Sequence, residues 1–162
     1  MIILGIDPSS KCTGWGVIRV IKNKITAIEH GHIDLPAKRP MSEKLDKIYN
    51  DIADIMYDFP PEIIAIERGF YGRNAKTAWV LGMVSGAIHL VAVNPANAYA
   101  SVYEYAPKEI KLAVAGNGNA TKERVRETVK KQLGITTELT LDESDALAIA
   151  LCCARKLSEE TK

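Results

Sequence analysis

The chain has 162 residues, enough for a sizeable hydrophobic core, and we expect a single domain over residues 1–162. Hydrophobic residues make up 47% and charged residues 25%, as in ordinary soluble globular proteins. The net charge of +1 excludes strong attraction of a polyanion by the molecule as a whole. A nucleic-acid partner would have to be bound by basic residues that the fold gathers locally.

The cysteines, the N-terminus and the hydropathy favour a cytoplasmic protein with no membrane partner. Cys12, Cys152 and Cys153 have neither metal-ligand nor CxxC spacing, and their odd number favours reduced thiols. The N-terminus lacks a basic region and Asp7 interrupts its apolar run, so we expect no signal peptide. Glycine, serine and histidine interrupt the apolar stretch 78–93, which falls short of the roughly 18 uninterrupted residues of a membrane span.

The first part of the chain predicts a three-stranded antiparallel meander, then a helix and a buried strand. The opening apolar run ends at Asp7 and Pro8. A carboxylate in a buried strand needs a cationic partner or a bound cation, unless Asp7 caps the turn that follows. Gly14 and Gly16 indicate close backbone approach or a bulge. The predicted elements are strands 1–7, 13–21, 25–33 and 62–67, and a helix from a cap at Ser42 to about Asp58.

The second part predicts an apolar helix over 75–93, on which Ala78, Gly82 and Gly86 share one face. Each glycine inside a helix costs about 1 kcal/mol relative to alanine, so we expect the sheet or a second subunit to pack closely there. The remaining predicted elements are a strand over 98–105, a short helix over 108–114 opened by Pro107, a helix over 122–133 capped by Thr121, and a helix from about 142 to 156. Together these elements predict a mixed sheet with helices on its faces.

Four carboxylates stand at special places in this arrangement. Asp7 and Glu67 each end a strand, and they become neighbours if the fourth strand lies parallel beside a central first strand. Asp142 and Asp145 share one face at the start of the last helix, where they could also serve as a capping pair. Clustered carboxylates repel one another, and divalent cations remove that repulsion. All-oxygen ligands suit Mg²⁺ or Mn²⁺, and two such ions can clamp the attacking and leaving oxygens of a phosphoryl displacement.

The chain resembles the RuvC family of Holliday junction resolvases, nucleases of the ribonuclease H-like superfamily, over nearly its whole length. Each matching piece is short, and their order and spacing make the resemblance specific. The matching residues are 3–8 (ILGIDP), 13–16 (TGWG), 65–67 (AIE), Phe70, 74–75 (NA), 81–82 (LG), Gly86, 116–122 (GNGNATK), Asp142 and 145–150 (DALAIA).

The resemblance implies a ribonuclease H-like fold, an α/β architecture with a five-stranded mixed sheet of order 3-2-1-4-5 flanked by helices. It implies that Asp7, Glu67, Asp142 and Asp145 are catalytic and bind two Mg²⁺, for which Mn²⁺ can substitute. The implied activity is a homodimeric endodeoxyribonuclease that nicks two opposing strands of a four-way junction in recombination and repair, leaving 5′-phosphate and 3′-hydroxyl ends. Cooperation with a branch-migration helicase stays open.

Basic residues near these acids are candidates for contacts with DNA. Phosphate contacts supply most of the affinity of such proteins and make it sensitive to salt. By resemblance, Lys111 and Lys122 face the substrate near the active site, and Phe70 stacks on an unpaired base. The alternatives are a solvated helix face for the basic residues of 122–131 and a core position for Phe70. The predicted DNA-binding residues are Arg68, Phe70, Arg73, Lys76, Lys108, Lys111, Lys122 and Arg124.

Two residues depart from the family pattern. Ser9 replaces the glycine that usually follows Asp-Pro, and Glu143 adds an acid between Asp142 and Asp145. We expect Glu143 to face solvent, and we expect His30 and His32 to lie on a solvated strand face.

Other functions remain to be weighed against a junction resolvase. Actin-like and sugar-kinase-like enzymes also have Gly-Ile-Asp on their first strand, but they need two lobes to enclose ATP, and 162 residues supply one. A non-catalytic junction-binding protein would gain nothing from clustered negative charge. A ribonuclease that cuts RNA–DNA hybrids would use the same metal chemistry and is the closer rival.

Overall fold

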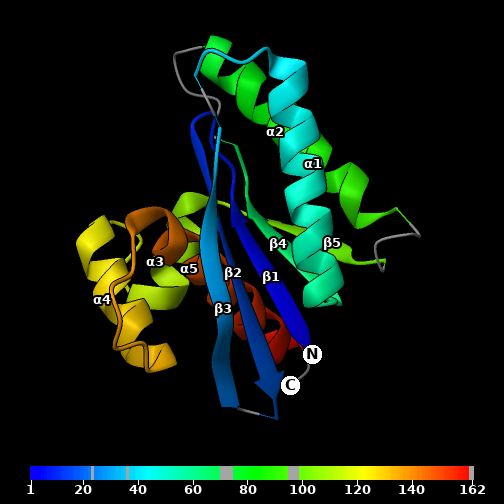
Figure 1. Ribbon diagram of the computed structural model, residues 1–162. Helices are drawn as coiled ribbons and strands as arrows, with labels where there is room; N and C mark the ends of the chain where they lie inside the picture. The colour runs from blue at the N-terminus through cyan, green and yellow to red at the C-terminus, as the bar shows by residue number, and fades with distance from the viewer. Residues whose placement is uncertain (23, 36, 70–74, 95–98, 161–162) are drawn as a thin grey trace.

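The computed structural model describes residues 1–22, 24–35, 37–69, 75–94 and 99–160. These residues form five strands and five helices. The elements follow one another largely as the sequence predicts (Figure 1). Their bounds are β1 Ile2–Asp7, β2 Cys12–Ile21, β3 Lys24–Asp34, α1 Met41–Asp58, β4 Ile63–Glu67, α2 Ala75–Ala92, β5 Ser101–Tyr105, α3 Pro107–Ala115, α4 Lys122–Leu133 and α5 Leu141–Glu160.

The sheet has the predicted order, β3-β2-β1-β4-β5. β1 pairs antiparallel with β2 and parallel with β4, and β5 extends the parallel half. The register sets Ile6 beside Ile66, so the next residues, Asp7 and Glu67, are the last of these parallel strands and lie at the same end of the sheet. The central position of β1 is therefore what makes these two acids neighbours.

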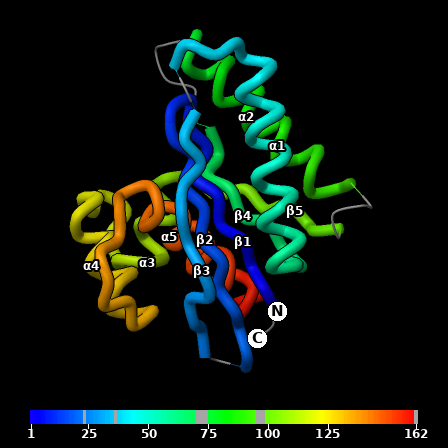
Figure 2. The backbone as a smooth tube through the Cα atoms, in the orientation of Figure 1, coloured from blue at the N-terminus to red at the C-terminus, as the bar shows by residue number. Residues whose placement is uncertain are grey.

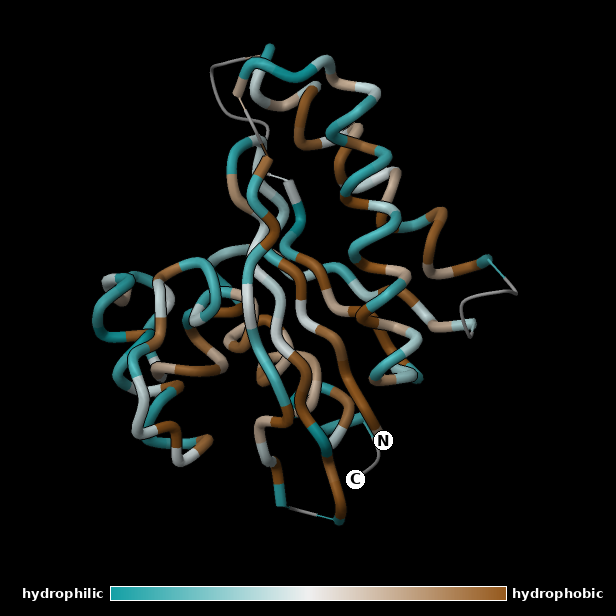
Figure 3. Tube along the Cα trace, viewed as in Figure 1, coloured by the Kyte–Doolittle hydropathy of each residue, from teal (hydrophilic) through white to brown (hydrophobic). Residues whose placement is uncertain are grey.

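Helices cover both faces of the sheet, as the tube trace in Figure 2 makes clear. α1 and α2 lie on one face, where Leu4 and Ile66 pack against Ile52 and Ile88. α3, α4 and α5 lie on the other face, over a second core that includes Ile3. In Figure 3 hydrophobic residues dominate β1, as expected of a strand buried on both sides.

Glycines on β1 and β2 let α5 lie against the sheet at backbone distance. A Cβ added at Gly5 would come within 2.1 Å of the carbonyl oxygen of Ala146, and one at Gly14 within 2.1 Å of that of Asp142. A Cβ at Gly16 would meet the Leu147 side chain at 2.6 Å. Close approach thus explains Gly14 and Gly16, while the irregularity in β2 falls between Val17 and Ile18.

α2 is apolar around much of its circumference. Val84, Ile88 and Val91 are buried, whereas Trp79 is 66% and Leu90 is 65% exposed. By length and composition α2 could cross a membrane, with a mean hydropathy of 1.3 and 22% of the stretch buried. A Cβ built at Gly82 or Gly86 would meet no atom of the described residues within 4 Å, so the sheet does not pack on this face as one expectation had it.

The helix starts test the predicted caps. Thr121 caps α4 as predicted, since its hydroxyl accepts a hydrogen bond from the backbone N–H of Arg124 at 3.2 Å. The predicted cap at Ser42 is wrong, because α1 begins at Met41 with Pro40 at the N-cap position and Ser42 inside the first turn. Pro107 opens α3 as predicted.

Candidate active site

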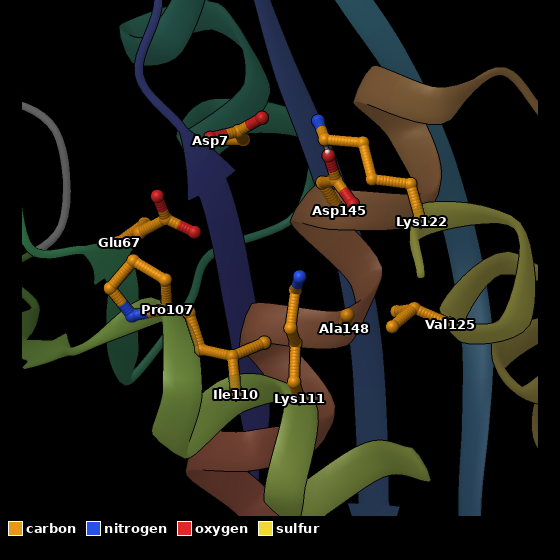
Figure 4. A pocket seen from close by; sticks show the side chains of 9 residues that line it. All are labelled: Asp7, Glu67, Pro107, Ile110, Lys111, Lys122, Val125, Asp145 and Ala148. Carbon is orange, nitrogen blue, oxygen red and sulfur yellow. Dashed lines mark hydrogen bonds and ion pairs between the residues drawn. The ribbon is translucent and has the colours of Figure 1, made fainter. Parts of the chain in front are cut away.

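Asp7 and Glu67 face one cavity at the end of the central strands. Figure 4 shows both carboxylates entering this space from β1 and β4, with Asp145 of α5 opposite them. The cavity has a volume of about 200 Å³, and its polar lining is completed by Lys111 of α3 and Lys122 of α4. Five elements of the fold thus contribute one charged side chain each.

Asp142 and Asp145 are on the first turn of α5, and a different pair caps that helix. The Glu143 side chain accepts a hydrogen bond from the Thr140 backbone N–H at 3.0 Å, and the Thr140 hydroxyl accepts one from the Glu143 backbone N–H at 3.3 Å. This reciprocal pair is a capping box. Asp142 and Asp145 are therefore not needed as the capping pair, which was the structural alternative for them.

Lys122 is the cation that the structure pairs with the acidic cluster. Its ammonium donates to Asp145 Oδ2 at 2.5 Å, as the dashed line in Figure 4 marks. The Lys122 side chain is 55% exposed and that of Asp145 17%, so the pair lies at the mouth of the cavity. The hydrogen bond to Asp145 raises the pKa of Lys122 above its usual value.

Burial and mutual repulsion disfavour ionisation of the acids deeper in the site. Desolvation, followed by the charges of Glu67 and Asp145, raises the pKa of Asp7 to about 7. The pKa of Glu67 is raised by desolvation and by Asp145, while Lys122 and Lys111 oppose that rise. A carboxyl that is half-protonated near neutral pH is one that an added cation would ionise.

The chemistry of the donor set fits a hard divalent cation. Its oxygens all come from carboxylates, the ligands that suit Mg²⁺ and Mn²⁺ better than zinc. Within the described residues, however, no three His, Cys, Asp or Glu side chains could hold a metal ion as they stand. The carboxylates and Lys122 would have to rearrange for an ion to bind.

Asp142 lies beside this cavity rather than in its lining. Its charge helps to raise the pKa of Asp7, and its carboxylate accepts a hydrogen bond from the Cys12 thiol. Desolvation and this hydrogen bond raise the pKa of Cys12 to about 12, so the thiol keeps its proton. The proximity of Cys12 to an acidic residue is a contact that sequence reasoning missed.

The structure distributes the predicted DNA-binding residues over several surfaces. Lys111 and Lys122 line the acidic cavity. Arg68 lies in a neighbouring groove of about 360 Å³ between β4 and α2, where its Nε is 3.8 Å from Glu104 Oε2. Lys76, Lys108 and Arg124 are exposed, and Arg124 lines a separate hollow on α4. Phe70 and Arg73 lie outside the described residues.

Glu143 of α5 lies beside two histidines of β3, His30 and His32, in the structure. Glu143 was expected to face solvent, but its side chain is 12% exposed, and His30 and His32 each approach it to 3.5 Å. Burial would raise the pKa of Glu143, yet hydrogen bonds from Thr140 and His32 hold it below its usual value. The expectation of a solvated strand face holds for His32, whose side chain is 42% exposed, but not for His30, whose side chain is 21% exposed. Both rings face Glu143 of α5.

Comparisons with known proteins place this geometry in a family. A family model described as crossover junction endodeoxyribonuclease RuvC matches residues 3–153. The RuvC proteins of Heliobacterium modesticaldum and Chloroherpeton thalassium are 38% and 41% identical to the chain. The aligned regions cover 98% of this chain and 96% of the first relative, and 94% of this chain and 81% of the second.

Solved structures agree with this assignment. Thermus thermophilus RuvC superposes with a TM-score of 0.87 at 31% identity, covering 99% of this chain and 98% of that one. The same protein in complex with a Holliday junction substrate gives a TM-score of 0.90, covering 99% and 97%. The yeast mitochondrial resolvase Ydc2, at 14% identity and a TM-score of 0.68, shares the fold. The chain therefore belongs to the RuvC family of crossover junction endodeoxyribonucleases.

Proposed function

We propose that this protein is an endonuclease that cuts four-way DNA junctions by paired symmetric nicks in recombination and repair, in the cytoplasm. The observation that carries the proposal is the convergence of Asp7, Glu67 and Asp145 with Lys111 and Lys122 in one cavity. The RuvC of T. thermophilus, solved with a Holliday junction substrate, supports the choice of DNA.

In this proposal Asp7, Glu67, Asp142 and Asp145 would hold two divalent cations, Mg²⁺ or Mn²⁺. When bound, such cations neutralise clustered carboxylates and stabilise the attacking and leaving oxygens of phosphodiester hydrolysis. The products would be a 5′-phosphate and a 3′-hydroxyl. The raised pKa of Asp7 supports the proposal, because burying an acid against other acids is unfavourable unless a ligand uses the negative charge.

The lysines of the cavity would bind the backbone of the DNA. Lys122 is half-exposed and pairs with Asp145, so its ammonium can exchange that carboxylate for a substrate phosphate. Lys111 comes from α3, across the cavity from Asp145, and offers a second positive charge. These two ammonium groups would hold the scissile phosphate and stabilise the charge that develops on it. Arg68, Lys76, Lys108 and Arg124 would make contacts further along the DNA.

A homodimer completes the proposal. The exposed face of α2 carries two apolar side chains and two glycines at helical spacing, Trp79, Gly82, Gly86 and Leu90. A second copy of the chain packed on this face would cover the apolar residues and give the glycines a close partner. Two active sites related by a two-fold axis would match the symmetry of a four-way junction.

The test compares a labelled four-way junction, a linear duplex and an RNA–DNA hybrid, each with and without Mg²⁺. We expect paired nicks at symmetric positions in the junction alone, only with the metal present. Asp7→Asn should abolish cutting and leave junction binding without metal within about twofold, because the change removes one charge and little volume. Asp54→Asn on the exposed surface of α1 is the matched control and should cut normally. Cutting by Asp7→Asn at the wild-type rate would refute the role of the acidic cavity.

A further inference from the structure

Two histidines of the edge strand β3 face the start of α5. The register of the sheet sets His32 beside Gly14 and His30 beside Gly16, the two glycines of β2 against which α5 packs. Residues two apart on a strand point to the same face. Gly31 between them faces the other side, where a Cβ would come within 2.8 Å of the Trp15 ring. Both imidazoles therefore project towards α5.

Glu143 is the residue of α5 that the two imidazoles face. Its Oε2 is 3.5 Å from Nδ1 of His30, and its Oε1 is 3.5 Å from Nδ1 of His32, so each ring faces one oxygen of Glu143. On its other side, Nε2 of His32 is 3.8 Å from Oδ2 of Asp34, which is largely exposed. Nδ1 of His30 is shielded from solvent and makes no hydrogen bond of good geometry within the described residues. A small movement of Glu143 towards β3 would supply that bond.

The same carboxylate also fixes the first turn of α5. Through its hydrogen bonds with Thr140 it forms the capping box, and it stands between Asp142 and Asp145 in the sequence. The backbone of Asp142 lies directly over Gly14, beside His32. A shift of Glu143 along the helix axis would therefore carry both neighbouring acids with it.

We propose that His30, His32 and Glu143 form a positioning clamp that sets the first turn of α5, and with it Asp142 and Asp145, at the height on the sheet that cation binding requires. The inference rests on the proposed nuclease function and deepens it. The clamp residues would not touch the substrate or the cations. They would act through the two acids, whose placement matters because small errors in the position of catalytic groups cost large factors in rate.

The clamp can be disrupted by changing either Glu143 or the two histidines. Glu143→Ala removes the charge and the capping acceptor, Glu143→Gln keeps an acceptor for Thr140 but removes the charge, and the double change His30→Gln with His32→Gln removes the partners. Glu138→Gln is the matched control, because it removes one negative charge from the exposed loop that precedes α5. Each variant is examined under conditions where urea titration shows it to be folded.

The readouts separate positioning from folding and from DNA binding. We expect the dissociation constant for Mn²⁺, measured by electron paramagnetic resonance without DNA, to rise about tenfold in Glu143→Ala and in the histidine double variant. Combining the two changes should add little. Glu143→Gln should recover part of the lost affinity, Glu138→Gln should match the wild type, and junction binding without metal should stay within about twofold of it.

Unchanged Mn²⁺ binding in both Glu143→Ala and the histidine double variant would overturn the clamp. A lower urea midpoint with normal Mn²⁺ binding would do the same, since it would reduce the three residues to a structural role. These outcomes are distinct from failure of the proposed function, which shows in the wild-type protein as an uncut junction. Mn²⁺ binding would still report on the clamp in that case.

Discussion

Glycines lie at two helix surfaces of this protein, and the described residues of the chain cover only one of them. On one, Gly5, Gly14 and Gly16 of the sheet accept α5 so closely that an added Cβ would overlap its backbone or side chains. On the other, Gly82 and Gly86 of α2 itself leave space that no described residue of the chain fills. A glycine in a regular element indicates close approach, and the structure shows whether the approaching group belongs to the same chain.

This difference distinguishes a contact inside the folded chain from a surface that is open to another molecule. The contact of α5 is internal, and it brings Asp142 and Asp145 to the ends of β1 and β4. The open face of α2 adds nothing to the core of this chain, although each of its glycines lowers helix stability by about 1 kcal/mol. Such a cost is expected where another molecule uses the surface, and in the proposed homodimer that molecule is a second copy of the chain.

Gly5→Ala should have the largest effect on stability, because it disrupts the internal contact between β1 and α5. The new methyl group would overlap the carbonyl oxygen of Ala146 and the side chain of Ala150, and neither can move without displacing α5. We expect the free energy of unfolding to fall by about 3 kcal/mol or more, as measured by urea titration, with loss of junction cutting. If Gly5→Ala were as stable as the wild type, α5 would not be held against β1 as described.

The pH dependence of stability should be the next largest effect, and it reports on the acids that α5 brings together. The pKa of Asp7 is about 7 in the folded protein against 3.8 for an aspartate exposed to water, so the folded state keeps a proton that the unfolded chain has released. Without metal, stability should therefore fall as the pH rises from about 4 to about 7. The contribution of Asp7 to this fall is on the order of 3 kcal/mol.

The comparison of Asp7→Asn with the wild type isolates that contribution, because the other titrating groups are common to both. In EDTA the variant should be the more stable protein at pH 8, and the difference should vanish near pH 4. Added Mg²⁺ should stabilise the wild type more than the variant at pH 8. Equal urea midpoints for both proteins at pH 8 in EDTA would show that burial and the neighbouring acids do not raise the pKa of Asp7.

Much of the fold and the outline of the site could be predicted because they depend on local patterns in the right order. The apolar run that ends at Asp7, the buried strand that ends at Glu67 and the alanines that follow Asp145 each restrict where an element can lie. The capping box was also readable, since Thr140 and Glu143 have the T-x-x-E spacing. Assigning that role to Glu143 would have shown that its side chain turns back towards the helix start.

The contacts of Glu143 with the histidines could not be predicted in the same way. His32 and Glu143 are 111 positions apart, and they meet because α5 crosses the glycines of β2 beside the edge strand. Successive residues of a strand such as β3 point to opposite faces, and the sequence alone did not show that the start of α5 reaches the face that carries the histidines. The sequence also could not show what packs on the glycines of α2. A helix face of small residues has the same sequence pattern whether it packs on a sheet or on another chain.

Replacing both Gly82 and Gly86 by alanine should have the smallest effect on folding and gives the sharpest test of the α2 face. Within one chain the added methyl groups meet no described atom, so each should stabilise the helix by up to about 1 kcal/mol. If the face is the homodimer contact, the same methyl groups would hold the two backbones apart and weaken association. We therefore expect higher stability in urea at low protein concentration together with a larger dimer dissociation constant in sedimentation equilibrium.

Ala53→Gly on the half-buried surface of α1 is the reverse control, which should lower stability and leave association unchanged. Undiminished dimerisation of the double variant would place the contact elsewhere on the molecule.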